Sequence, residues 1–253
     1  MTRPRKDVET VRDLLAEGLP VAEASRRAGI PRGTVRSWLS DGLEVRLDAA
    51  RGLNEPNDLC PYVRDLSENA YAYLLGMYLG DGCISRHPND VYKLRIFQDN
   101  RYPSLIRECI VAIHWVVQNR VGILQRPGCK EIYSFSKHWP CLFPQHGPGP
   151  KHEREIVLEA WQRWVAIERH PRLLLRGLIH SDGWRGTNRV TVRGKRYEYP
   201  RYMFSNRSAD IRRIFTDACD RAGIDWRQGY DWMISISRRD AVEAMDRFIG
   251  LKS

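Results

Sequence analysis

The sequence lacks any long apolar run, and no apolar stretch follows its basic amino terminus, MTRPRKDVET. A membrane-spanning helix needs roughly 18 or more apolar residues, and a secretory leader needs an apolar segment behind the basic one. We therefore expect a soluble, cytoplasmic protein without a membrane partner. The six cysteines stand singly, with no C-x-x-C pair, which argues against a zinc ribbon or a thiol redox site.

Acidic residues are fewer than basic ones: the chain has 31 Asp and Glu and 41 Lys and Arg, which gives a net charge of +10. In a chain that is 42% hydrophobic, this balance predicts a folded protein with a polyanionic partner. Residues 1–50 carry a net +1 and residues 51–253 a net +9. The excess peaks in residues 183–207, where seven basic residues and one acid alternate with aromatic residues. The alternative for that segment is a pair of solvated surface strands.

Residues 7–42 predict three short helices. Apolar residues recur at helical spacing from Val11, a second helix should span about 21–28, and a third should begin at Pro31 after a turn at Gly29. Small and apolar residues then fall at the inward positions of a helix-turn-helix, namely Ala24, Ser25, Ala28, Ile30, Val35 and Trp38.

This segment resembles the helix-turn-helix of resolvases and homeodomain-like regulators, although any compact three-helix bundle could imitate it. The resemblance implies that the third helix enters the major groove of DNA. The outward residues that would contact DNA are Arg32, Thr34, Arg36 and Ser37. We expect a helix-turn-helix domain over residues 1–50, followed by a glycine- and proline-containing linker over residues 51–65.

The remainder contains an internal repeat. LLGMYLGDG (74–82) matches LRGLIHSDG (175–183), and the two aspartates, Asp81 and Asp182, are 101 residues apart. The similarity continues: residues 94–110 correspond to 201–217, and residues 131–143 to 232–244. Each half, about 66–151 and 152–253, predicts the order helix, two strands, helix, two strands, helix.

These motifs resemble those of a single-chain LAGLIDADG homing endonuclease, over residues 66–253. The resemblance implies an α+β fold, a pseudo-two-fold αββαββα saddle whose central helices touch at Gly76 and Gly177. It also implies that Asp81 and Asp182 meet at the base of the saddle and hold Mg²⁺ or Mn²⁺. A basic residue follows the last helix of each half in that family, and here Lys151 and Lys252 are again 101 residues apart.

The chemistry of these residues agrees with the resemblance. Hydrolysis of a phosphodiester uses a divalent metal held by hard oxygen ligands, which carboxylates supply. A single Asp-Gly at the end of an apolar helix is usually only a cap and turn, and a terminal lysine is often solvated. Two copies at equal spacing favour the functional interpretation.

We therefore expect a monomeric, free-standing enzyme that binds double-stranded DNA and cleaves it. We expect it to be a prokaryotic, cytoplasmic protein that associates with the nucleoid. No splicing signature flanks the repeat. Candidate DNA-binding residues outside the head are basic, namely Arg95, Arg101, Arg185, Arg189, Arg193, Arg196, Arg201 and Arg207.

Two alternatives remain open. The saddle could serve a transcriptional regulator that binds DNA without cutting it, and a recombinase would fit the head alone. The two motif ends also differ, since His180 and Ser181 precede Asp182 where Leu79 and Gly80 precede Asp81. His180 could reach a metal, but a polar contact at the helix end is the simpler interpretation.

Overall fold

The computed structural model describes residues 5–40, 60–250 and 252. The chain divides into two compact units, residues 1–64 and 65–253. The predicted domain boundary near Arg51 lies outside the described residues. The predicted linker, residues 51–65, ends in regular structure, because the short helix α5 spans Pro61–Arg64. No helix in the described ranges is long and apolar enough to cross a membrane.

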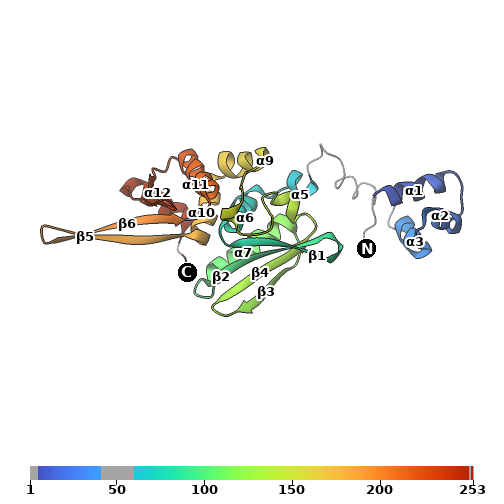
Figure 1. The fold of residues 1–253 in the computed structure, drawn as a ribbon, viewed down its shortest axis with the longest axis horizontal. Helices are drawn as coiled ribbons and strands as arrows, with labels where there is room; N and C mark the ends of the chain where they lie inside the picture. Colours follow the sequence, from blue (N-terminus) through green and yellow to red (C-terminus); the bar gives the residue numbers. More distant parts are fainter. Residues whose placement is uncertain (1–4, 41–59, 251, 253) are drawn as a thin grey trace. The chain divides into compact units, whose positions relative to one another are not determined.

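The described helices at the start of the first unit are α1 (Arg5–Ala16), α2 (Val21–Ala28) and α3 (Arg32–Ser40) (Figure 1). Their common core contains Val8, Val11, Ile30, Val35 and Trp38. Gly29 ends α2 with a positive φ of 65°, a conformation that suits glycine. The Ser25 hydroxyl donates a hydrogen bond to the Ile30 carbonyl, which holds the turn between α2 and α3.

The second unit has two halves with the same order of elements. The first half contains α6 (Glu68–Asp81), β1 (Gly82–His87), η1 (Pro88–Asp90), β2 (Val91–Asp99), α7 (Pro103–Val117), β3 (Val121–Arg126), β4 (Cys129–Ser136) and α8 (Trp139–Leu142). The second contains α10 (Pro171–Asp182), β5 (Gly183–Val192), β6 (Lys195–Ser205), α11 (Ala209–Ala222), β7 (Arg227–Gln228), β8 (Met233–Ile236) and α12 (Arg239–Ile249). Between them lie η2 (Lys151–Glu153), α9 (Ala160–Gln162) and the π-helical η3 (Arg163–Arg169).

Each half forms a four-stranded antiparallel sheet, with the orders β1-β2-β4-β3 and β5-β6-β8-β7. The helices cover one face of each sheet, where alternate residues such as Leu94, Ile96, Tyr202 and Phe204 are buried. We call the other face of each sheet its open face. Side chains alternate between the faces, so membership follows from the register.

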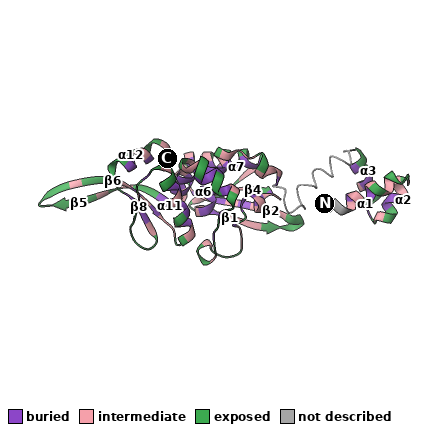
Figure 2. Cartoon of the chain, turned by 90° about the horizontal axis from the view of Figure 1, so that it is seen from above, coloured by how far each residue is buried: buried purple, intermediate pink, exposed green. Residues whose placement is uncertain are grey.

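Helices α6 and α10 lie side by side at the centre of this unit (Figure 1). Residues 71–79 of α6 are all buried, as Figure 2 shows by the purple concentrated around this helix. A helix that is apolar on every side is expected only where neighbours surround it. The shared core of the two halves therefore fixes the ends of α6 and α10, where both aspartates lie.

The register corrects the two predicted strand correspondences by one residue. Gly82, which follows Asp81, pairs with Ile96, whereas Gly183, which follows Asp182, pairs with Phe204. Ile96 in the first half is therefore equivalent to Phe204 in the second. The repeat seen in the sequence instead aligns Phe97 with Phe204. The β4–β8 match is displaced in the same way, because Ile96 pairs with Ile132 and Phe204 with Ile234. A slip of one residue exchanges the two faces of a strand.

Candidate active site and nucleic-acid interface

The close approach of α6 and α10 depends on two glycines. A Cβ added to Gly76 would lie 2.6 Å from the carbonyl oxygen of Leu174, and one added to Gly177 would overlap the carbonyl of Tyr73. Backbone therefore packs directly on backbone at this crossing. The sequence singled out both glycines for this interface, and the structure brings them together there.

The two aspartates are held at the touching ends of these helices. The Gln98 amide donates to the Asp81 carboxylate at 3.0 Å, and the Asn206 amide donates to that of Asp182 at 2.6 Å. A Cβ on Gly80 would overlap the Ser181 side chain and lie 3.1 Å from Cγ of Asp182. The last residues of the two helices are therefore in contact, with one amide orienting each carboxylate.

Sequence reasoning missed Gln98 and Asn206. Gln98 lies two residues after Ile96, which pairs with Gly82, and Asn206 lies two residues after Phe204, which pairs with Gly183. The two amides therefore occupy equivalent places in the two halves. The one-residue slip concealed this equivalence, since the comparison aligned Gln98 with Ser205. The signal was present only in the hydrogen-bond register.

Both predicted lysines lie at the same place. Lys151 donates to the carbonyls of Tyr78, Leu79 and Gly80 in the last turn of α6, at 2.9 Å for the latter two. Lys252 donates to the carbonyl of Gly183 at 2.6 Å. A cation at a helix carboxyl terminus also interacts favourably with the helix dipole.

The four groups influence one another's ionisation. Burial, with a further contribution from the charge of Asp182, raises the pKa of Asp81 to about 6, while Lys151 and Lys252 oppose the rise. Burial likewise raises the pKa of Asp182. Burial lowers the pKa of Lys151 to about 8 and also lowers that of Lys252, against the attraction of both aspartates. The arrangement is a partly desolvated cluster of two acids and two bases.

An open hollow of about 250 Å³ adjoins this cluster. Its lining includes Gly80, Lys151 and Asp182, together with Asn206 and Arg207 beyond the end of β6. Arg207, a predicted DNA-binding residue, therefore lies beside one of the two acids. The hollow gives a ligand access to the end of the motif helices.

His180 does not belong to this cluster. Its ring is buried, with Nδ1 3.1 Å from the Tyr73 hydroxyl and Nε2 2.9 Å from the carbonyl oxygen of Ile249. Burial, followed by the charge of Arg176, lowers its pKa to about 4, so the ring is neutral. His180 therefore makes a polar contact at the end of α12, the simpler of the two interpretations considered from the sequence.

Arg176 reinforces the same contact. It donates to the carbonyls of Phe248 and Ile249 and pairs with Glu108 of α7 at 2.7 Å. The carboxyl end of α12 is thus tied to both halves just before Lys252. Such an attachment limits the movement of the segment that carries the lysine.

The predicted arginines of β5 and β6 fall on different faces. Arg185, Arg189 and Arg196 share the face of Tyr202 and Phe204, whereas Arg201 is on the open face. Arg185 is engaged with Asp246 of α12 at 2.7 and 2.8 Å. The segment 183–207 is therefore not a single basic surface.

The other predicted arginines occupy varied settings. Arg189 and Arg196 lie near Glu198, Arg193 forms the turn between β5 and β6 with φ 49°, and Arg101 pairs with Asp99. Arg95 is on the open face of the first sheet. The Nε atoms of Arg95 and Arg201 are buried without a hydrogen-bond partner in the described part of the chain.

The open face of the first sheet also carries an ion cluster that the sequence did not reveal. Glu131, 1% exposed, accepts from Lys93 at 2.7 Å and from Arg126 at 2.6 and 3.0 Å. The Lys93 ammonium also lies 4.2 Å from the centre of the Tyr133 ring. Two cations are thereby fixed on this face.

In the first unit, Arg32, Arg36 and Ser37 are exposed and Thr34 is partly buried on α3. Val35 and Trp38 face the core, as predicted. The outward residues of α3 are therefore accessible to a ligand.

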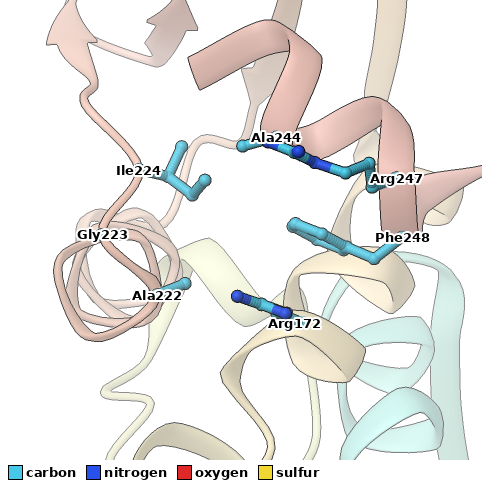
Figure 3. A pocket seen from close by; sticks show the side chains of 7 residues that line it. All are labelled: Arg172, Ala222, Gly223, Ile224, Ala244, Arg247 and Phe248. Carbon is cyan, nitrogen blue, oxygen red and sulfur yellow. The ribbon is translucent and has the colours of Figure 1, made fainter. Parts of the chain in front are cut away.

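A second hollow, of about 460 Å³, lies among the ends of α10, α11 and α12. Figure 3 shows Arg172 and Phe248 facing it, with the Arg172 guanidinium 5.9 Å from the ring centre. It contains neither motif aspartate and neither predicted lysine. It is thus separate from the candidate active site.

No family model and no curated protein matches the sequence. Among solved structures, I-DmoI in complex with DNA and calcium is 16% identical, with a TM-score of 0.45, over 73% of this chain and 91% of that one. The I-SmaMI LAGLIDADG homing endonuclease bound to cleaved DNA is 7% identical, with a TM-score of 0.47, over 74% and 84% of the two chains. I-DmoI and I-SmaMI are both homing endonucleases.

Proposed function

We propose that this protein is a site-specific endonuclease of the LAGLIDADG type that binds double-stranded DNA and hydrolyses its phosphodiester backbone. The observation that carries the proposal is the cluster of Asp81, Asp182, Lys151 and Lys252 at the touching helix ends. Placing two buried carboxylates side by side is unfavourable unless a cation compensates them. Clusters of buried titratable groups with strongly shifted pKa values are therefore candidates for functional sites.

The donor set fits a divalent metal. Carboxylate oxygens of Asp81 and Asp182 are the hard ligands that Mg²⁺ and Mn²⁺ prefer, and burial raises the pKa of both, so that a bound cation would favour their charged forms. When bound, such an ion supplies Lewis acidity and lowers the pKa of coordinated water. Gln98 and Asn206 orient the carboxylates through their amides.

The two lysines supply positive charge that does not depend on a metal. Lys151 and Lys252 lie close enough to both aspartates to affect their ionisation. Lys151 also lines the hollow, so a phosphate brought there would meet its ammonium group. Charge placed in advance stabilises an anionic transition state at little cost of reorganisation. We assign them this role.

Duplex DNA is the proposed substrate because the chain is strongly basic and both open faces carry cations. Arg95 on the first sheet and Arg201 on the second offer donors to phosphates and base edges. The cluster of Lys93, Arg126 and Glu131 adds a net positive charge to the first sheet. We further propose that the two halves form a covalent pseudo-dimer, active as a monomer. The helices of residues 5–40 would extend the recognised site as a helix-turn-helix.

The test begins with selection of tightly bound duplexes from a randomised library, followed by incubation with Mg²⁺, Mn²⁺ or EDTA. Native protein should cut a selected duplex only with metal, and Asp81→Asn and Asp182→Asn should each abolish double-strand cleavage while retaining binding. Asp217→Asn, which removes an acid from the outer helix α11, is the matched control and should cut normally. Native protein that binds the duplex tightly and never nicks it would instead be a regulator.

A further inference from the structure

The outer part of the β5–β6 hairpin is a two-stranded ribbon with two chemically different faces. Strand β8 pairs only with residues 202–205 of β6, so residues 184–192 and 195–201 pair only with each other. We call these two segments the ribbon. Figure 1 shows it projecting from the rest of its unit. A helix meets the ribbon at its base, where Arg185 pairs with Asp246 of α12.

The open face of the ribbon is largely apolar, although Asn188 also lies on it opposite Tyr199. Trp184, Val190, Val192 and Tyr199 are between 38% and 50% exposed there. Tyr197 stacks on Tyr199 with ring centres 6.2 Å apart and an angle of 9°. The opposite face is polar, since its residues are Arg185, Thr187, Arg189, Thr191, Arg196, Glu198 and Pro200. This pattern is the reverse of what solvent exposure on the open side would favour.

Positive charge borders the apolar face. Lys195 and Arg201 lie on the same face, and the Lys195 ammonium is 5.7 Å from the centre of the Tyr197 ring. Arg193 lies at the tip. An apolar strip between cations is complementary to a surface whose centre is apolar and whose edges are anionic. It is a poor match for a second copy of the same ribbon, because the cations of the two copies would meet.

The major groove of DNA has this chemistry. It admits a two-stranded ribbon, its edges are phosphates, and the thymine methyl is the apolar group that base edges present there. We propose that the open face of the ribbon recognises thymine methyl groups in the major groove, so that one half of the target is read by apolar contact. This inference rests on the proposed binding of duplex DNA.

The position of the ribbon supports this use. Trp184 follows Asp182 by two residues, and Gly186 leaves room on the open face for Trp184 and for Met203, whose Cε would be 3.3 Å from an added Cβ. The apolar surface is therefore continuous along the chain with the candidate active site. The first sheet differs, because its open face is centred on the ion cluster of Lys93, Arg126 and Glu131.

The experiment replaces each thymine of a selected duplex, one at a time, with deoxyuridine, which lacks only the methyl group. Binding of the full-length native protein should weaken roughly fourfold for each contacted methyl, the effect expected for one buried carbon. The affected positions should cluster on one side of the cleavage centre. The double variant Val190→Ala with Val192→Ala should lose this sensitivity at the subset of positions that the two valines contact.

The matched control is Thr187→Ala with Thr191→Ala on the opposite face, which should keep the native sensitivity to deoxyuridine. Equal sensitivity in all three proteins, or none in the native protein, would overturn the inference while leaving cleavage intact. Binding without cleavage would overturn only the endonuclease proposal. A native dimer that the valine variant abolishes in sedimentation would assign the face to a second copy and would likewise overturn the inference.

Discussion

The ammonium of Lys151 lies 2.9 Å from the carbonyl oxygen of Gly80, the residue immediately before Asp81. The last residue of the first half thus returns to the end of the first helix of that half. This contact places a positive charge beside both carboxylates and satisfies carbonyls that a helix end leaves without partners. It makes Lys151 the most informative target for mutation.

Lys151→Met is expected to reduce cleavage by about 100-fold or more, the loss typical of one electrostatic donor in a preorganised site. Binding of a selected duplex should change much less, since one phosphate contact at most is lost. Single-turnover cleavage beside a titration of affinity measures both. Lys137→Met, which removes the same charge from the turn after β4, should cut normally. Native cleavage by Lys151→Met would remove this lysine from the mechanism.

Asp81→Asn is expected to stabilise the metal-free protein at neutral pH. A carboxyl whose pKa rises from 3.8 to about 6 on folding contributes stability below pH 3.8 and loses it as the pH rises through 6. In EDTA, the native protein should therefore lose on the order of 2 kcal/mol, relative to the variant, between pH 4 and 7.5. Thermal unfolding measures this. Addition of Mg²⁺ should stabilise the native protein more than the variant, and a less stable variant in EDTA at pH 7.5 would contradict the prediction.

Gly177→Ala is expected to destabilise the protein by about 1–3 kcal/mol or more, because the added methyl group overlaps the Tyr73 carbonyl. Urea unfolding gives the difference. Gly147→Ala is a suitable control, since its Cβ would approach nothing closer than the Arg154 guanidinium at 3.5 Å. Equal stabilities of the two variants would mean that α6 and α10 can separate without cost.

Glu131→Gln tests the ion cluster on the first sheet through its pH dependence. Burial by itself would raise the pKa of Glu131, but hydrogen bonds from Lys93 and Arg126 prevail and lower it. A carboxyl whose pKa is lower in the folded than in the unfolded protein stabilises the fold at pH values above its unfolded pKa. This stability is lost as the pH falls through the pKa of the folded state. The variant should therefore be less stable than the native protein by about 1–3 kcal/mol at pH 7. This difference in the free energy of unfolding should become smaller toward pH 3.

Urea unfolding at several pH values measures the gap for Glu131→Gln. Glu198→Gln, at a 53% exposed partner of Arg189, should change stability by about 0.5 kcal/mol or less. A gap for Glu131→Gln that stays constant with pH would show that packing, and not charge, makes the contribution.

Arg32→Ala and Arg36→Ala are each expected to weaken binding by about 1–3 kcal/mol if α3 contacts bases. Arg26→Ala removes an exposed arginine that pairs with Glu23 on α2, so it serves as the control. Removing residues 1–50 should shorten the protected footprint without unfolding residues 65–253. An unchanged footprint would assign the head to a role other than DNA contact.

Much of the fold could be predicted because its signals are local or repeated. The ends of α2 and the order of elements in both halves follow from spacing along the chain, whereas the helix contact at Gly76 and Gly177 was expected from the resemblance of the repeated motifs to a known family. The register could not be predicted, since an alternating strand does not specify which residue pairs with the glycine. That single uncertainty concealed Gln98 and Asn206.

Ion pairs between residues that are distant in sequence could not be predicted either. Arg185 was expected to contact DNA, but Asp246, which neutralises it, comes from α12 at the far end of the second half. Glu131 is similar, because one of its partners, Lys93, is 38 residues away along the chain. In both cases tertiary packing decides whether a charged side chain is available.

The contact between Gly80 and Ser181 has a consequence for how the protein could be divided. The space that Gly80 leaves is filled by Ser181, so the two helix ends fit only as an unlike pair. Two copies of the first half would bring glycine to glycine and leave a gap beside the aspartates, and two copies of the second would bring serine against serine and collide. A symmetric homodimer built from either half would therefore need a compensating substitution at this position before its acids could meet as they do here.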